Sequence, residues 1–220
     1  MTHIVFHIEG GADRSQSGDM RKAFHDFFSE LHTLATANGS RIEPVVMHGS
    51  RSRAYKGFCH ALKTQPGKYH VLLVDSEDSV KHRGECWRHL RERQADGWAC
   101  PAGVEGAQCH LMVQAVEAWF FADPGKLEEY YEQNFQVSSL PVRQNVEGIP
   151  KSEHIAKLEA ATRHSQKGLY HKTNHLPALL GKIRAAKVRE RAWHCDRIFV
   201  TLSERLGAKL TPLCTLQQEP

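Results

Sequence analysis

Three short apolar runs, separated by segments with helical periodicity, constrain the fold of this chain more than any other feature. The runs lie at 3–8, 42–47 and 69–74, and their β-branched and aromatic side chains are typical of buried strands. Between them, apolar residues recur every three or four positions, as they do in amphipathic helices. Because strand and helix alternate, the order predicts an α/β fold with a parallel sheet and right-handed crossovers.

The second half of the chain continues this alternation and then becomes helical. Residues 109–113 are another short apolar run, which predicts a fourth strand. Helical periodicity dominates three later segments, at about 151–163, 175–185 and 187–206. We therefore expect an α/β core at 1–135, a helical C-terminal portion packed on it at 136–207, and a tail at 208–220.

Composition excludes several classes of protein. The chain of 220 residues is 25% charged and 40% hydrophobic, as is usual for globular proteins. No apolar run reaches the roughly 20 residues that a membrane span needs. The N-terminal segment lacks a basic stretch followed by a long apolar one, so it does not resemble a secretory signal. We therefore expect a cytoplasmic protein that does not associate with a membrane.

The six cysteines do not indicate a disulfide framework, because they are scattered and no Cys-x-x-Cys pair occurs. A zinc site can be drawn from them and nearby histidines, but its irregular spacing differs from that of structural zinc motifs. Its ligands would be Cys86, His89, Cys100, Cys109 and His110.

Acidic residues follow two of the predicted strands. Glu9 comes directly after the first strand, and Asp75 directly after the third. The carboxyl ends of parallel strands meet at one edge of a sheet, where ligands of such folds bind. Either carboxylate alone could cap a helix or fill a turn, but carboxylates that meet on rigid strand ends are ligands that Mg²⁺ prefers. The combination favours a site for a divalent metal.

The residues after Asp75 leave two arrangements open. If the strand continues, alternate side chains point to one side and Glu77 joins Asp75. If the chain turns at Ser76, Asp78 joins it instead. Further along, Glu117 follows the predicted fourth strand, and it is either an additional carboxylate of the site or a residue at the solvent edge of a helix.

Basic residues dominate the segment 143–197, far along the chain from the acidic strand ends. An acidic metal site facing a basic tract suits a phosphate-bearing substrate, although a solvated helical surface has the same charge pattern. A lysine in this tract can stabilise the charge on a phosphate, and a histidine can transfer protons. The candidates are Lys151, Lys167, Lys172 and His175.

These motifs resemble those of the Toprim domain, the catalytic fold of topoisomerases, bacterial primases and OLD-family nucleases. That family has a glutamate after its first strand and an acidic pair after its third. The matching residues are Glu9 in IVFHIEGGAD, and Asp75 with Glu77 in HVLLVDSED. OLD-type nucleases have a second acidic residue four positions after the glutamate, where Asp13 stands, and a downstream lysine, for which Lys172 is the best candidate.

A closer similarity is to a bacterial family of Toprim-like proteins that are often encoded beside AAA/ABC-type ATPases. It rests on the strings HLMVQAVEAWFFAD at 110–123 and KGLYHKTNH at 167–175. The sequence departs from the Toprim pattern at 75–77, where Asp-Ser-Glu replaces Asp-x-Asp. Glutamate can still bind magnesium, but its longer side chain changes the spacing that a two-metal centre needs.

The resemblance implies a nuclease that needs Mg²⁺ or Mn²⁺ and cleaves DNA or tRNA. Glu9 would bind metal or act as general base, and Lys172 would steady the phosphate. The remaining ligands of one or two ions would be Asp13, Asp75 and Glu77.

The resemblance also implies control by a neighbouring ATPase, as in effectors of anti-phage defence, since the chain has no nucleotide-binding loop of its own. One alternative is a non-catalytic Toprim-like adaptor that binds an ATPase or nucleic acid. Another is an enzyme that transfers phosphoryl groups to a small molecule. Assembly into a homo-oligomer is left open.

Overall fold

The computed structural model describes residues 1–11 and 14–216, and it has an α/β fold built on a parallel sheet of five strands. Along the sheet the strand order is β2-β1-β4-β5, with β3 also paired to β1. The strands are β1 (His3–Ile8), β2 (Arg41–Ile42), β3 (Val46–Met47), β4 (Tyr69–Asp75) and β5 (Cys109–Met112). The predicted fold class, a parallel α/β sheet flanked by helices with a helical C-terminal portion, is confirmed.

The strand predicted at 42–47 is divided into two short strands, β2 and β3. Both pair with β1, through Ile4↔Ile42 and Ile8↔Met47. Between them stands Pro44, which has no backbone N–H to donate to the ladder. The proline therefore interrupts an edge strand that the apolar pattern predicted as continuous.

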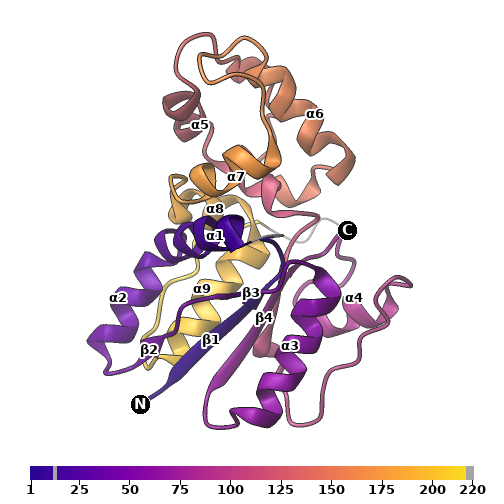
Figure 1. Ribbon diagram of the computed structural model, residues 1–220, viewed down its shortest axis with the longest axis vertical. Coiled ribbons are helices and arrows are strands. Elements are labelled where there is room, and N and C mark those ends of the chain that lie inside the picture. Colours follow the sequence, from indigo (N-terminus) through magenta and orange to yellow (C-terminus); the bar gives the residue numbers. More distant parts are fainter. Residues whose placement is uncertain (12–13, 217–220) are drawn as a thin grey trace.

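Helices cover both faces of the sheet (Figure 1). Side chains alternate along β4, so that Val71 and Leu73 belong to the larger apolar core and Leu72 and Val74 to the smaller one. The larger core lies under α1 (Arg14–Phe27), α2 (Ser29–Ala37) and α9 (Trp193–Arg205). The smaller core lies under α3 (Arg51–Thr64) and α4 (Cys86–Glu92).

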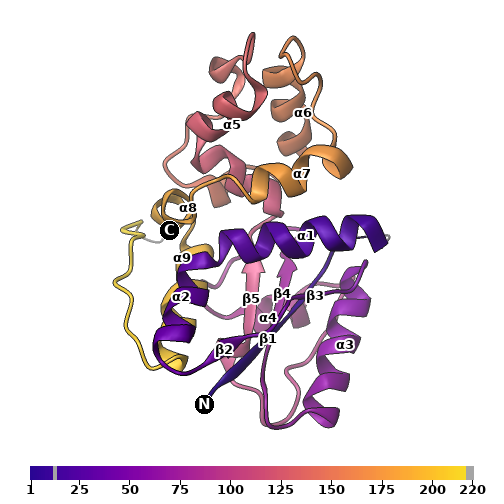
Figure 2. The ribbon, with the colours of Figure 1, turned by 60° about the vertical axis from the view of Figure 1, so that its left-hand side comes forward.

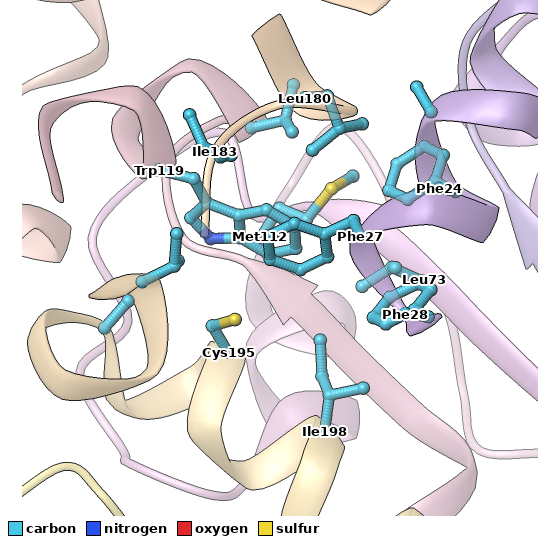
Figure 3. Close-up of a cluster of buried hydrophobic side chains, with 14 of the residues drawn as sticks. Phe24, Phe27, Phe28, Leu73, Met112, Trp119, Leu180, Ile183, Cys195 and Ile198 are labelled. Atoms are coloured by element: carbon cyan, nitrogen blue, oxygen red, sulfur yellow. The ribbon is translucent and has the colours of Figure 1, made fainter. Parts of the chain in front are cut away.

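Aromatic side chains from distant segments meet in the larger core (Figure 3). The ring of Phe27 stacks on that of Trp119 with 4.8 Å between centroids, and Phe6 stacks on Phe28 at 4.9 Å. Phe199 of α9 contacts the edge of Phe27. Because stacked and edge-on aromatic pairs add to the free energy gained by burial, this cluster fixes α1 and α9 against the sheet and against the segment that follows β5.

Three helices form a cap over the carboxyl ends of the strands (Figures 1 and 2). We call residues 124–180 the helical cap. Its helices are α5 (Pro124–Tyr131), α6 (Lys151–Thr162) and α7 (Lys172–Leu180). In Figure 2, β4 and β5 point toward α7, and α7 lies along α1. Whatever binds at the strand ends therefore lies between the sheet and the cap.

The helical segments after β5 differ in detail from those predicted. The helix expected directly after the strand is a 3₁₀ helix, Val116–Ala122. The helix expected at 187–206 is two helices, α8 (Ala185–Arg191) and α9, separated at Ala192. α9 lies against the sheet beside β5 and α2, and α8 contacts α9 and the 3₁₀ helix Val116–Ala122 (Figure 2). The boundary expected at residue 135 stays a prediction.

The chain after α9 has no regular secondary structure up to Leu216, but Leu213 and Cys214 donate backbone N–H bonds to Asp196 of α9. In the part of the chain that is described, no helix is long and apolar enough to span a bilayer.

Three histidines form a hydrogen-bonded chain beneath α3. His7 Nδ1 lies 3.0 Å from His48 Nε2, and His7 Nε2 lies 3.1 Å from His70 Nδ1. His70 Nε2 lies 3.0 Å from the carbonyl oxygen of Gln65, which can only accept, so this nitrogen carries the proton. His48 and His7 must then each donate through Nε2. A side chain at Gly57 would collide with the His48 ring, so the glycine makes room for the chain.

This arrangement requires His7 and His70 to be neutral, because each accepts a hydrogen bond through Nδ1. Burial, and then the neighbouring His48 and His70, lower the pKa of His7 from 6.5 to about 3. Burial also lowers the pKa of His48 and His70. The unfolded chain therefore binds protons that the folded chain excludes, and stability is lost as pH falls below about 6.5.

We expect the free energy of unfolding to fall below pH ~6.5, by up to about 1.4 kcal/mol per pH unit for each buried histidine. In His7→Gln this slope should be shallower, because one group that cannot be protonated in the folded state is gone. Urea denaturation between about pH 5 and pH 8 measures the slope. The exposed His60 provides the matched control, His60→Gln. Equal slopes in the two variants would contradict the assignment.

Candidate metal centre

Three of the predicted metal ligands meet above the sheet. Glu9, Asp75 and Glu77 can each offer one carboxylate oxygen such that the three oxygens lie within 4.8 Å of one another. Asp75 is buried, and the other two are partly buried. The residues come from the ends of β1 and β4, which pair in parallel with Ile8 opposite Leu73. Neighbouring parallel strands thus bring together side chains that are 66 positions apart in sequence.

Glu9 is held in place by the backbone and by an arginine. Its Oε2 accepts bonds from the backbone N–H of Asp75 and from Arg51 Nη1, both at 3.2 Å. Gly10 and Gly11 follow with φ angles of +113° and +75°, a conformation that favours glycine. The two glycines turn the chain sharply after β1 and leave the Glu9 side chain at the strand end.

Asp75 is the most deeply placed of the three carboxylates, with 5% of its surface exposed. Its Oδ1 accepts a 3.0 Å bond from the backbone N–H of Val116, at the start of the 3₁₀ helix. Burial, followed by the charges of Glu9 and Glu117, raises the pKa of Asp75 well above its ordinary value. Burial also raises the pKa of Glu9, although Arg51 opposes this. Both carboxylates therefore gain from a nearby cation.

Glu77 reaches the centre through a turn and not by continuation of the strand. β4 ends at Asp75, and Glu77 has φ +70°, a left-handed conformation that is costly for a residue with a side chain. The turn is held by bonds to the segment after β5: Ser76 N–H to Met112 O at 2.9 Å, and Glu77 N–H to Gln114 O at 3.0 Å. One arrangement expected from the sequence was a continuing strand that brings Glu77 to Asp75, and the other was a turn that brings Asp78 there. Each is correct in one part only, since the chain turns but Glu77, not Asp78, faces Asp75.

Gln114 connects this turn to the cap and is itself left-handed, with φ +56°. Its Nε2 donates to Glu147 O at 3.1 Å, and its Oε1 accepts from the Lys151 backbone N–H at 2.8 Å. Lys151, the first residue of α6, in turn places its Nζ 2.7 Å from Glu77 Oε2. Glu77 and Gln114, which are bonded to each other, thus both have strained backbone conformations that these contacts hold in place. Strained residues held in this way are common at functional sites.

Glu117 and Lys172 form a second acid–base pair beside the centre. Glu117 is 2% exposed, and Lys172 Nζ lies 2.7 Å from its Oε1. Burial alone would lower the pKa of Lys172, but Glu117, Asp75 and Glu9 raise it. Lys172 is the first residue of α7 and remains 54% exposed at its side chain. The lysine is therefore charged and reaches both the buried carboxylate and the solvent.

Each ligand carboxylate has one oxygen held by the protein and one that is not. Glu9 Oε2, Asp75 Oδ1 and Glu77 Oε2 accept the bonds described above. Among the residues whose side chains the structure describes, 1–11 and 17–216, none donates a hydrogen bond to their second oxygens. Mg²⁺ and Mn²⁺ take hard oxygen ligands and fill the rest of an octahedral shell with water and substrate oxygens. Three converging carboxylate oxygens fit such an ion.

A cavity of about 280 Å³ opens beside these carboxylates. Glu9, Asp75 and Lys172 line its polar side. Its apolar wall comes from α1, β5 with its following segment, and α7: Met20, Phe24, Met112, Val116, Leu176 and Pro177. The centre is therefore open to a molecule larger than water, and the same cavity presents both negative and positive groups.

Other predicted site residues lie elsewhere or are not described. Asp78 is paired with Arg93 at 3.0 Å and is 69% exposed. Lys167 pairs with Glu132 within the cap, at 3.3 Å. His175 Nδ1 accepts from the Tyr131 hydroxyl and the His171 N–H, and it does not line the cavity. Asp13 lies outside the described residues.

The zinc set that the sequence allowed is not assembled in the described part of the chain, where the one group able to hold a metal is the carboxylate set. Cys86 and Cys109 are buried, whereas Cys100 is exposed. His110 is buried with both ring nitrogens bonded, Nε2 to Ala107 O and Nδ1 to Arg197. The cysteines and histidines of this set are therefore part of the packing and its hydrogen bonds.

Arg51, the first residue of α3, also belongs to the centre, although it was not among the residues predicted from the sequence. Arg51 contacts Glu9, the backbone carbonyl of Asp75 and both oxygens of Asp96. A signal was present, since helices that follow strands of a parallel sheet begin at the same edge where the strands end. A basic residue at the start of such a helix, directly after Gly49-Ser50, was a candidate for the site.

We expect Asp75→Asn to stabilise the metal-free protein. Because the pKa of Asp75 is raised on folding, its ionisation costs stability at every pH above the unfolded value of 3.8, and the amide removes that cost. The melting temperature in EDTA at neutral pH should rise by a few degrees, the change that ~1 kcal/mol makes in a chain of this size. The gain should disappear toward pH ~4.

Added Mn²⁺ should raise the melting temperature of the native protein but not that of Asp75→Asn, since a ligand that binds only the folded state stabilises it. Asp78→Asn is the matched control, because this exposed carboxylate lies outside the centre. It should respond to metal like the native protein. A metal response that survives in Asp75→Asn would exclude Asp75 as a ligand.

Comparison with known proteins gives one match. A family model described as Domain of unknown function (DUF4276) matches residues 8–203. This segment contains Glu9, Asp75 and Glu77 as well as Lys151 and Lys172. No curated protein and no solved structure matches. Because the model covers most of the chain, the protein belongs to the DUF4276 family.

Proposed function

We propose that this protein is a metal-dependent phosphodiesterase that cleaves nucleic acid, DNA or tRNA. The observation that carries the proposal is the cavity in which two of the converging carboxylates, Glu9 and Asp75, face the charged amine of Lys172. Phosphodiester hydrolysis needs a divalent cation on carboxylates and a further cation for the charge that develops on the phosphate. This cavity offers residues for both.

The centre would bind Mg²⁺ or Mn²⁺ through the free oxygens of Glu9, Asp75 and Glu77, and the ion would polarise the phosphate and acidify a bound water. Two residues of the chain would supply the other two roles, a cation for the phosphate and an acceptor for the proton of water. Lys172 Nζ would donate to a non-bridging phosphate oxygen while keeping its contact with Glu117. Glu9, which lines the cavity at the end of β1, would accept the proton of the attacking water.

The ion pairs at the site suit this chemistry. The contact between Lys151 Nζ and Glu77 Oε2 leaves the lysine 37% exposed and free to reach solvent. A phosphate arriving in the cavity is a stronger partner for the amine than a carboxylate that has just acquired a metal. Lys151 and Lys172 would then both face the substrate, one from the start of each cap helix.

The alternative is a non-catalytic adaptor, and one observation favours it. Glu9, Glu77 and Glu117 each already have a basic partner, which a domain without a metal would also need. Incubation with plasmid and with tRNA, in Mg²⁺, Mn²⁺ or EDTA, separates the two functions. Cleavage that requires metal supports the enzyme, and intact substrate in every arm supports the adaptor.

The cytoplasmic location, the ATPase partner and the role in anti-phage defence remain proposals that rest on the resemblance to Toprim-like proteins encoded beside ATPases. The sequence has no Gly-Lys-Ser/Thr phosphate-binding loop, so a separate ATPase would have to supply any nucleotide-dependent control. The test of the ATPase partner is co-purification with the neighbouring ATPase, followed by a comparison of cleavage with and without it.

We expect Lys172→Ala to reduce the rate of cleavage by about 10²–10³-fold, the usual loss for one donor to a developing negative charge. The same change should also lower stability, by roughly 1–3 kcal/mol, because the Glu117 carboxylate is 2% exposed and loses its cation. This differs from the behaviour of a solvated loop lysine, whose removal changes stability little.

The variant Lys172→Ala/Glu117→Gln separates the two effects. Replacing the carboxylate by an amide removes the unpaired buried charge, so stability should return while cleavage stays low. Lys167→Ala is the control, because that lysine pairs with Glu132 away from the cavity. If the double variant regains activity together with stability, Lys172 is a structural residue and does not contact the substrate.

A further inference from the structure

Arg51 is held rigidly at the metal centre. Its Nε and Nη2 donate to the two oxygens of Asp96 at 2.9 and 2.7 Å, a bidentate pair of the strongest kind. Its guanidinium lies over the Trp98 ring, 5.1 Å from the centroid. Only 14% of the side chain is exposed. The position of this charge is therefore fixed from two sides before any ligand binds.

The remaining nitrogen of Arg51 occupies a place suited to a metal ion. Nη1 donates to Glu9 Oε2 at 3.2 Å and to the backbone carbonyl oxygen of Asp75. A carboxylate oxygen and a carbonyl oxygen side by side are hard ligands that a divalent cation would otherwise take. In this structure a guanidinium, which stays charged at every physiological pH, already satisfies both.

Lys151, the other cation on the carboxylate set, is held differently. Its ammonium has one contact, with Glu77 Oε2 at 2.7 Å, and its side chain is 37% exposed. It can leave Glu77 without breaking other bonds. Arg51 cannot leave Glu9 without abandoning Asp96, Trp98 and the Asp75 carbonyl. Lys151 is therefore the cation that a metal at this centre would replace, and Arg51 would keep its position.

We propose that Arg51 takes the place of a second divalent cation, so that the centre binds one metal ion and not two. This inference rests on the proposed function and deepens it. The single ion binds the free oxygens of Glu9, Asp75 and Glu77, while Arg51 holds Glu9 Oε2 and the Asp75 carbonyl.

The charges agree with this arrangement. Three ionised carboxylates carry three negative charges, and one divalent ion with Arg51 supplies three positive ones. A second divalent ion would lie beside the guanidinium at a site already neutral, and like charges at close range in a partly buried site are costly. Asp96, which pairs with Arg51, also pairs with Arg93. Its charge is therefore balanced by two arginines, and it does not need a metal.

The test counts bound Mn²⁺. Isothermal titration of the full chain should give one ion per molecule, and the electron paramagnetic resonance spectrum should be that of an isolated Mn²⁺, without the coupling of a neighbouring ion. The variant Arg51→Met/Asp96→Asn removes the guanidinium and neutralises Asp96, so that Asp96 is not left as an unpaired buried charge. The stoichiometry of this variant should rise from one to two, since Glu9 Oε2 and the Asp75 carbonyl become free.

Arg93→Gln is the matched control. Arg93 also pairs with Asp96, at 3.2 Å, but does not touch Glu9, and its variant should bind one ion. Two ions in the native protein would overturn the inference while leaving the proposed function intact. One ion in both the native protein and the double variant would show that Arg51 does not exclude a second. No bound ion in the native protein would remove the proposed function itself. If the double variant does not fold, the count and spectrum of the native protein still decide whether the centre binds one ion or two.

Discussion

The parallel pairing of β1 with β4 is the constraint on which the candidate site depends. With Ile8 opposite Leu73, β4 extends beyond the end of β1, so that Glu9 lies beside the last residues of β4 and the backbone N–H of Asp75 donates to Glu9 Oε2. A shift of one residue would turn every side chain of β4 to the other face and move Val71 and Leu73 out of their core. The apolar packing of the sheet therefore fixes the geometry of the carboxylates as well.

Bringing three carboxylates together costs free energy, and the protein offsets it with cations that differ in mobility. Arg51 is fixed by Asp96 and Trp98, whereas Lys151 has a single contact and can exchange one partner for another. The left-handed turn at Glu77 adds a further cost. Such a site is less stable than a neutral one would be, and this is common where groups are arranged for binding or catalysis and not for stability.

The two lysines of the site come from a different layer of the molecule than its three carboxylates and Arg51. The carboxylates and Arg51 belong to the sheet and to the start of α3, while Lys151 and Lys172 are the first residues of cap helices α6 and α7 (Figure 2). The cap is joined to the turn after β4 through Gln114, which bonds to both Glu147 and Lys151. Any movement of α6 relative to the sheet would therefore change the contact between Lys151 and Glu77.

The sequence by itself determined the alternation of strands and helices, the parallel sheet and the meeting of Glu9 with Asp75, because apolar alternation and strand ends are local signals along the chain. It also pointed to Glu77, Lys151 and Lys172 as members of the site. Only the tertiary structure decided that the chain turns at Glu77, that Lys167 and His175 lie away from the cavity, and that Arg51 binds Glu9. These depend on hydrogen bonds and ion pairs between segments distant in sequence, such as Gln114 with Lys151 and Arg51 with Asp96, which no local pattern specifies.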